Sequence, residues 1–242
     1  MKYITLFGTT EAYNAATLDL PNVSLVEENM SVNYKNTLPI PSHDFVEIGG
    51  IKWATMNVGA NSVTDTGLYF QWGDTQGYTA AQAGIDKTFD WGNYIWYDEV
   101  YGISKYHYVR DKKEILESSD DAATAVWGGN WRMATSKEFN SLIENTTSAW
   151  TNDYQGSGVS GVVLTDIIDN SKSIFLPAGG NCDGDGCYNT GNNSYGYYWT
   201  SSVNTDDNPE YAWYLSFNSR HVGCDDNCER FLGYNIRAIL DK

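Results

Sequence analysis

The chain has 242 residues, of which 41% are hydrophobic and 14% aromatic, so it is long enough to form one large domain or two small ones with a proper core. Its formal net charge of -16 and sequence pI of about 4.3 create a field that repels phosphate groups, which argues against nucleic acid and anionic membranes as partners. No run approaches the roughly 18 apolar residues that a membrane helix needs, so we expect no membrane insertion.

The first 41 residues differ in pattern from the rest. The stretch LDLPNVSLVEENMSVNYKN alternates apolar and polar positions between turn residues, which predicts short strands. The opening MKYITLFGTTEAYNAA has one Lys and no long apolar core, so it predicts no signal peptide and synthesis in the cytoplasm. Pro39 and Pro41 mark a boundary. We therefore separate a β-rich segment, residues 1–41, which packs on the main domain or on other copies of itself, from a main domain, residues 42–242.

The main domain begins with strand and turn patterns. FVEIGGIKWATMNVGA predicts a hairpin that turns at Gly49 and Gly50. GLYFQWGDT, from Gly67 to Thr75, predicts a second unit of strand and turn. Residues 76–108 are rich in aromatic side chains without a clear period, so we expect a long excursion that its own side chains pack.

Two helices are predicted next. The first covers Ser119 to Val126, with Ser119 as its cap. The second follows Thr135, which forms a capping box with Glu138. Its apolar positions share one face, namely Phe139, Leu142 and Ile143.

The rest of the chain predicts short strands. Residues from Asn145 onward resemble turn material, and strands are then expected in VSGVVLTDI, SIFLPAGG, YYWTSS, AWYLSF and GYNIRAIL. Two helices with many short, mostly antiparallel strands define an α+β fold class.

Residues 181–237 have the composition of a binding surface. They are crowded with Tyr and Trp, which offer large and stiff contact area, and with Ser, Asn and Gly, which offer adaptable hydrogen bonds. Alternation predicts that Trp199 is buried and that Tyr197 supports the rim. The candidate ligand-binding residues are Asp183, Asp185, Tyr188, Asn204, Asp206, Asp207, Tyr211, Trp213, Tyr214, Ser216, Asn218, Arg220, His221, Asp225, Asp226, Asn227 and Arg230.

The candidates between 211 and 221 surround three expected core residues, Ala212, Leu215 and Phe217. They cannot all share one face of a flat strand, so either a bulge or bend is expected there or some of these residues are not exposed. Asp225, Asp226 and Asn227 are expected on a loop between two cysteines.

Cysteines and acidic residues in this region raise the question of a metal. The four cysteines are Cys182, Cys187, Cys224 and Cys228. We expect free surface thiols first, a disulfide second and a metal site third. Cytosolic synthesis disfavours disulfides, and neither spacing is the tight pair of a zinc site. The run 181–186, N-x-D-x-D-G, is similar to the start of a calcium loop, but its twelfth position is Asn192. We expect no cofactor and keep calcium as an alternative.

Six motifs in order carry a family resemblance. VEIGGIKWATMNVGA, GLYFQWGDT, DDAATAVWGGNWRMATSKEFNSLI, SIFLPAGG, YYWTSS and GYNIRAIL resemble the major paralogous domain first described in Fibrobacter. The resemblance covers roughly Asp44 to Leu240 and implies a C-type lectin-like fold, related to the formylglycine-generating enzyme, in which two helices brace short antiparallel strands. It also implies that Arg237 belongs to the framework.

Family members of this kind include the variable proteins of diversity-generating retroelements, in which a reverse transcriptase rewrites codons at adenines. The resemblance implies that 181–237 is the variable region. Mutating both adenines of an AAC codon cannot give Lys, Glu, Gln, Met or Trp. The region lacks Lys, Gln and Met, so its unreachable residues would be unmutated positions: Glu210, Glu229, Trp199 and Trp213.

The formylglycine-generating relatives use reactive cysteines, but we expect no enzyme here. Acidic neighbours such as Glu229 would raise the pKa of Cys224 and Cys228.

The first 41 residues and the acidic, Tyr-rich body also resemble tail-tip proteins of phages that infect Bacteroides-type gut bacteria. The resemblances together imply a hypervariable receptor-binding protein on the virion, displayed as a homo-oligomer, with a trimer favoured, that recognises a bacterial surface protein or glycan. The alternative is a bacterial surface lectin or adhesin domain with a fixed ligand.

Overall fold

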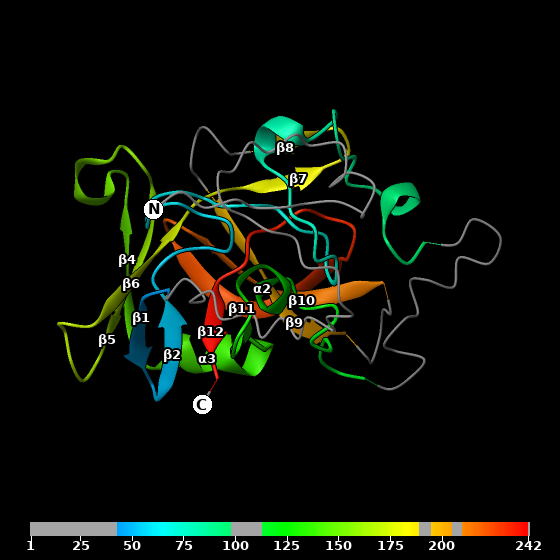
Figure 1. Cartoon of the computed structure of the whole chain (residues 1–242). Helices are drawn as coiled ribbons and strands as arrows, with labels where there is room; N and C mark the ends of the chain where they lie inside the picture. Colours follow the sequence, from blue (N-terminus) through cyan, green and yellow to red (C-terminus); the bar gives the residue numbers. More distant parts are fainter. Residues whose placement is uncertain (1–42, 98–112, 189–194, 205–209, 242) are drawn as a thin grey trace, which may run out of the picture. The chain divides into compact units, whose positions relative to one another are not determined.

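The computed structural model (Figure 1) describes four stretches, all within one compact unit that runs from Pro39 to Lys242: 43–97, 113–188, 195–204 and 210–241. The predicted N-terminal segment lies outside the described residues, as do residues 98–108 of the predicted excursion.

The predicted α+β class, a C-type lectin-like fold with two bracing helices, is wrong. The described residues are mostly β-strands, in several small antiparallel sheets, and their two α-helices are short, α2 at Ala122–Trp127 and α3 at Ser136–Glu144. The physical reason is that the helical period holds for only six and nine residues, while strands form where loops and turns were expected. Strand β4 (Thr146–Thr151) follows α3 directly, and β11 (His221–Glu229) includes the predicted loop.

The first sheet joins the two ends of the main domain. Its order is β1-β2-β12-β3, with β1 at Phe45–Ile48, β2 at Ile51–Ala54, β12 at Ala238–Leu240 and β3 at Trp131–Met133. The predicted hairpin is confirmed, since β1 pairs with β2 around Gly49 and Gly50, which both have positive φ. The strand predicted in GLYFQWGDT is wrong, because Tyr69 and Phe70 form only isolated bridges.

The excursion after this point contains two short 3-10 helices, η1 at Ala80–Gln82 and η2 at Trp91–Asn93. Phe89 and Tyr94 are buried, and their rings contact others of the excursion, such as Tyr78 and Trp96. Phe89 also packs on Tyr69 and Cys182, and Tyr94 Oη donates to Trp72 O. The segment is therefore packed only partly by its own side chains.

Two further sheets are formed by residues from the middle of the chain. One has the order β4-β5-β6, with β5 at Gly161–Asp166 and β6 at Ser173–Pro177, and a 3-10 helix η4 (Tyr154–Gly156) before β5. The other is a two-stranded hairpin of β7 (Asn181–Asp183) and β8 (Gly186–Tyr188), drawn apart from it in Figure 1.

The sheet that positions the candidate site has the order β11-β10-β9, with β9 at Tyr195–Val203 and β10 at Tyr211–Asn218. Its two faces contribute to two hydrophobic clusters. Trp199, Ala212 and Tyr214 belong to one cluster, and Tyr198, Leu215 and Phe217 belong to the other. The predicted burial of Trp199, Ala212, Leu215 and Phe217 is therefore confirmed.

The predicted irregularity in β10 is also confirmed. Its register against β11 shifts between Tyr214 and Ser216, and its register against β9 shifts between Ala212 and Tyr214. Each shift places extra residues on the strand that pairs with β10, a β-bulge-like irregularity.

The helix caps differ in outcome. The capping box of α3 is confirmed, with Thr135 Oγ1 accepting from Glu138 N at 3.2 Å and Glu138 Oε2 accepting from Thr135 N at 2.8 Å. The cap predicted for the first helix is wrong. Asp121, not Ser119, caps the helix by accepting from Thr124 N. The same carboxylate accepts from Met133 N and so links the start of α2 to β3.

Arg237, which precedes β12, is fully buried and belongs to the framework as expected. Its Nε and Nη2 donate to Asn57 Oδ1 at 3.0 and 2.7 Å, and its other donations go to the carbonyls of Ala54 and Phe175. Asn57 Nδ2 donates in turn to Tyr198 Oη at 3.0 Å. One guanidinium thus ties β2, β6 and β9 together.

Candidate functional site

The β9–β10–β11 sheet exposes a surface that we call the tyrosine face. Side chains on one side of the sheet alternate along each strand, and the register places the members opposite one another across the three strands. Toward one end of the sheet, the side chains on this side no longer belong to the hydrophobic cluster and are exposed or half-buried. The tyrosine face consists of Tyr195, Tyr197, Ser216, Asn218, His221 and Asp226.

A row of aromatic rings supports this face from within. Tyr195, which is 41% exposed, stacks on Tyr197 with ring centroids 6.1 Å apart. Tyr197 stacks on buried Tyr234 at 5.2 Å, and Tyr234 stacks on fully buried Trp199 at 4.3 Å. Trp199 is fixed by donating from Nε1 to the carbonyls of Phe70 and Leu232. The exposed tyrosine therefore stands at the end of a rigid aromatic row.

Polar groups surround the tyrosines. Asp226 is exposed and its Oδ2 accepts a hydrogen bond from Tyr214 Oη at 3.0 Å, so a buried phenol orients an exposed carboxylate. Burial and the nearby Asp226 both raise the pKa of Tyr214 above its usual value, which keeps the phenol a donor. Asn218 Oδ1 accepts from Arg220 N at 2.8 Å in the turn between β10 and β11. The face offers donors and acceptors around an aromatic platform.

Three predicted site residues are buried, and their prediction as ligand contacts is wrong. Tyr214 is only 8% exposed because Tyr197, Trp199 and Tyr234 surround it. Asn204 is also buried, and its backbone N donates to Tyr211 O.

Arg230 is the third, and it is fully buried. Its guanidinium lies over the rings of Trp72, Tyr94 and Trp96, within 5.3 to 5.9 Å of their centroids. Trp72 comes from the segment Gly67 to Thr75, and Tyr94 and Trp96 come from the excursion, so sequence position alone does not reveal this enclosure.

Other predicted residues have mixed outcomes. Asp206 and Asp207 lie outside the described residues, and the side chain of Asp225 is not described. The predicted loop at 225–227 is wrong, because these residues belong to β11 and Tyr214 pairs with Asp226 in the ladder. Arg220 is exposed in the turn beside the tyrosine face.

Three further candidates lie on the opposite side of the same sheet. Tyr211 and Trp213 pair with Glu229 and Asn227, and alternation directs these four side chains away from the tyrosine face. Tyr211 Oη donates to Glu229 Oε1 at 3.3 Å. The single binding surface expected from the sequence is therefore divided between two faces.

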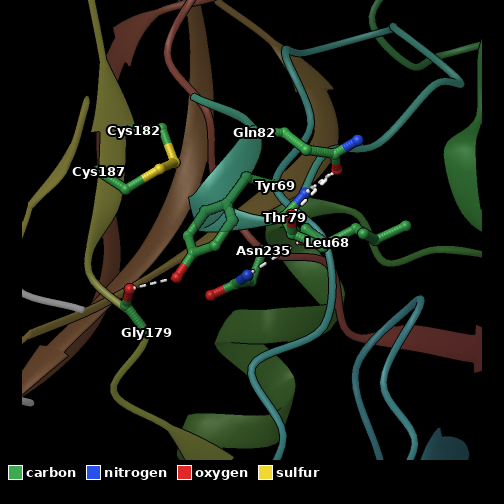
Figure 2. Close-up of a disulfide and its surroundings, with 8 residues drawn as sticks. All are labelled: Leu68, Tyr69, Thr79, Gln82, Gly179, Cys182, Cys187 and Asn235. Carbon is green, nitrogen blue, oxygen red and sulfur yellow. Dashed lines mark hydrogen bonds between the residues drawn. A yellow bond between two sulfur atoms is a disulfide. The ribbon is translucent and has the colours of Figure 1, made fainter. Parts of the chain in front are cut away.

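Asp183, Asp185 and Tyr188 lie on the separate β7–β8 hairpin, exposed to solvent. A disulfide between Cys182 and Cys187 closes this hairpin, so the expectation of free surface thiols there is wrong (Figure 2). The two cysteines are paired directly across the strands, and both backbone groups of Cys182 bond instead to Gly233. Such a non-hydrogen-bonded pair brings its side chains close together.

Figure 2 shows what holds the surroundings of the disulfide. Tyr69 Oη donates to Gly179 O at 2.6 Å, and Asn235 Nδ2 donates to Leu68 O at 3.1 Å. The carboxylate of Asp185 accepts from Thr88 Oγ1. In the part of the chain that the structure describes, no group of three or more His, Cys, Asp or Glu side chains is arranged to hold a metal ion.

The other two cysteines are not surface thiols. Cys224 is buried, and Cys228 is partly buried beside Glu229. Cys228 Sγ donates to Glu229 Oε2 at 2.8 Å. Burial and this carboxylate raise the pKa of Cys228 to about 12, which is the direction that the acidic sequence around it predicts.

Sequence reasoning missed Tyr195 as a member of the site. The signal was available, because Tyr195, Tyr197 and Trp199 alternate along one strand and so share one side of it. The buried Tyr234 behind them could not be found this way, since it comes from a different segment.

Comparison with protein-family models, with curated proteins and with solved structures finds no match to this chain. None of the helices in the described ranges has the length and apolar character needed to span a membrane.

Proposed function

We propose that the protein is a receptor-binding protein whose tyrosine face recognises a protein or glycan on a bacterial surface. The observation that carries this proposal is an exposed Tyr195 stacked on half-buried Tyr197 at the end of an aromatic row, with Ser, Asn, His and Asp side chains beside them on β10 and β11. Tyrosine supplies contact area at low entropic cost, and tyrosine is enriched at binding hot spots. Preorganisation lowers the cost of binding further.

We propose also that a retroelement diversifies this face. All six of its residues are types that adenine mutation of an AAC codon can produce. Trp213 and Glu229, whose residue types adenine mutation of an AAC codon cannot produce, lie on the opposite side of the sheet. Trp199, another such residue, is buried in the framework. A nearby imperfect DNA copy of these codons, differing only at adenines and beside a reverse transcriptase gene, would support diversification. Its absence would favour the alternative, a surface lectin or adhesin with a fixed ligand.

The setting that we propose is a phage tail, with residues 1–41 joining a homo-oligomer, a trimer being favoured. The resemblance to tail-tip and variable proteins supports this setting. The Cys182–Cys187 disulfide supports a protein that works outside the cytosol, where disulfides persist. We propose no catalytic activity and no cofactor.

The test is binding of the fluorescently labelled full chain to a panel of Bacteroides-type cells, measured by flow cytometry. Tyr195→Ala is expected to weaken binding to the cells that the wild type labels by about 10-fold or more, as loss of a hot spot does. Tyr97→Ala is the matched control, because Tyr97 is also 41% exposed but lies outside the sheet. Unchanged binding by Tyr195→Ala, or an equal loss in both variants, would refute the proposed site.

A further inference from the structure

The opposite side of the β9–β10–β11 sheet carries two hollows that meet at Trp213. We call them together the Trp213 groove. The larger has a volume of about 410 Å³ and the smaller about 290 Å³, close to the lower end of the range of roughly 300–1,000 Å³ typical of small-ligand sites. Residues Glu114, Ile115, Ser136, Lys137 and Val203 line the larger hollow, and Ser136, Asn140 and Cys224 line the smaller.

The walls of the Trp213 groove are fixed by hydrogen bonds. The carbonyl of Trp213 accepts from Thr200 Oγ1 at 2.8 Å. Ser136 N, at the start of α3, donates to Ser202 Oγ at 3.1 Å. On the other side, the backbone of Glu114 accepts from Val203 N, and Leu116 N donates to Ser201 O. A ligand would therefore meet a site that is already formed.

The chemistry of the groove is that of an aromatic surface with polar edges. Trp213 is partly exposed, and its indole N–H has no hydrogen-bond partner among the residues that the structure describes. Ser136 and Asn140 both line the smaller hollow beside Trp213, where Ser136 Oγ lies 3.3 Å from Ser202 Oγ and Asn140 Nδ2 donates to Cys224 O at 3.4 Å. Glu114 and Lys137 bring one charge of each sign, so the groove favours neither an anion nor a cation.

A neutral hexose matches these features. A pyranose ring presents C–H groups on one face, which stack on an indole, and hydroxyls at its edge, which bond to amides and hydroxyls. A peptide matches less well, because extended peptides pair with an open strand edge. Trp213 lies on β10, the central strand, whose two edges are already occupied by β9 and β11.

We propose that the Trp213 groove binds a neutral hexose-containing glycan, with one sugar ring against the indole and the chain extending across both hollows. This site uses a different face from the tyrosine face, so either proposal can fail while the other holds.

The experiment is isothermal titration calorimetry of the full chain with neutral tetrasaccharides of glucose, mannose and galactose. At least one is expected to bind with a Kd between about 10 µM and 1 mM, the range of about −7 to −4 kcal/mol. Trp213→Ala is expected to weaken that binding by at least 10-fold, and Trp213→Tyr to retain most of it. Tyr195→Ala is expected to leave it unchanged.

Several results would overturn the proposal. They are the absence of binding by all three tetrasaccharides, equal binding by wild type and Trp213→Ala, and tighter binding of an anionic tetragalacturonate. Binding of a casein peptide digest that depends on Trp213, without binding of the sugars, would assign the groove to peptides instead. Melting temperatures of both Trp213 variants show that they fold, and the tyrosine variant keeps the test valid if the alanine variant does not.

Discussion

Replacing Arg237 with Met is expected to lower the free energy of unfolding by about 3–5 kcal/mol, a large share of the roughly 5–15 kcal/mol typical of a domain. The side chain is fully buried and donates to three acceptors on two segments, Asn57 Oδ1 and the carbonyl of Ala54 on one and the carbonyl of Phe175 on the other. Met occupies a similar volume but cannot donate. Three buried acceptors would then lose their partner, at about 1–3 kcal/mol each and less than additively.

Burial lowers the pKa of Arg237 to about 10, so the guanidinium still carries its charge at neutral pH. The matched control is Arg220→Met. Arg220 is exposed in the turn after β10, and its hydrogen bond to Asn218 Oδ1 uses the backbone N and not the guanidinium. Urea unfolding followed by circular dichroism should show a change within about 0.5 kcal/mol for this control. A loss below 1 kcal/mol in the Arg237 variant would contradict the role given to it here.

Replacing Trp199 with Ala is the second large effect, an expected loss of about 3–5 kcal/mol. Trp199 is fully buried, stacks on Tyr234 and donates from Nε1 to Phe70 O at 2.9 Å. Alanine leaves a cavity under the aromatic row and removes the indole donor from the carbonyls of Phe70, which keeps its bond from Tyr234 N, and Leu232.

Trp213→Ala is the matched control, because it removes the same type of side chain from the neighbouring strand, at a position that is partly exposed. Its expected cost is no more than about 1–2 kcal/mol, since less apolar area leaves the interior. The measurement is thermal unfolding of both variants by differential scanning calorimetry. Equal losses would mean that the aromatic row is not a framework element.

Local signals were enough to predict several parts of the fold. The capping box of α3 and the hairpin at Gly49 and Gly50 depend on residues that are neighbours in the chain. Alternation along one strand was enough to predict that Trp199 is buried. The framework role of Arg237 followed from a family resemblance and not from a local pattern.

The remaining parts depend on segments that meet only in the folded chain. Tyr214 is buried because Tyr234, from another segment of the chain, packs against it. Arg230 is enclosed by rings that precede it by more than a hundred residues, such as Trp96. The fold class was wrong because β4 and β11 take strand conformation through pairing with their neighbours, while their own sequences resemble turns and loops.

The central claim is that the exposed positions of the tyrosine face vary without unfolding the protein. The most direct test compares two displayed libraries by resistance to protease. One randomises Tyr195, Ser216, Asn218 and His221 among Asn, Asp, Ser, Tyr, His and Gly, and the other does the same at Trp199, Tyr214, Leu215 and Phe217. We predict that most members of the first library resist cleavage as the wild type does, and that few members of the second do. Equal losses in the two libraries would contradict the account.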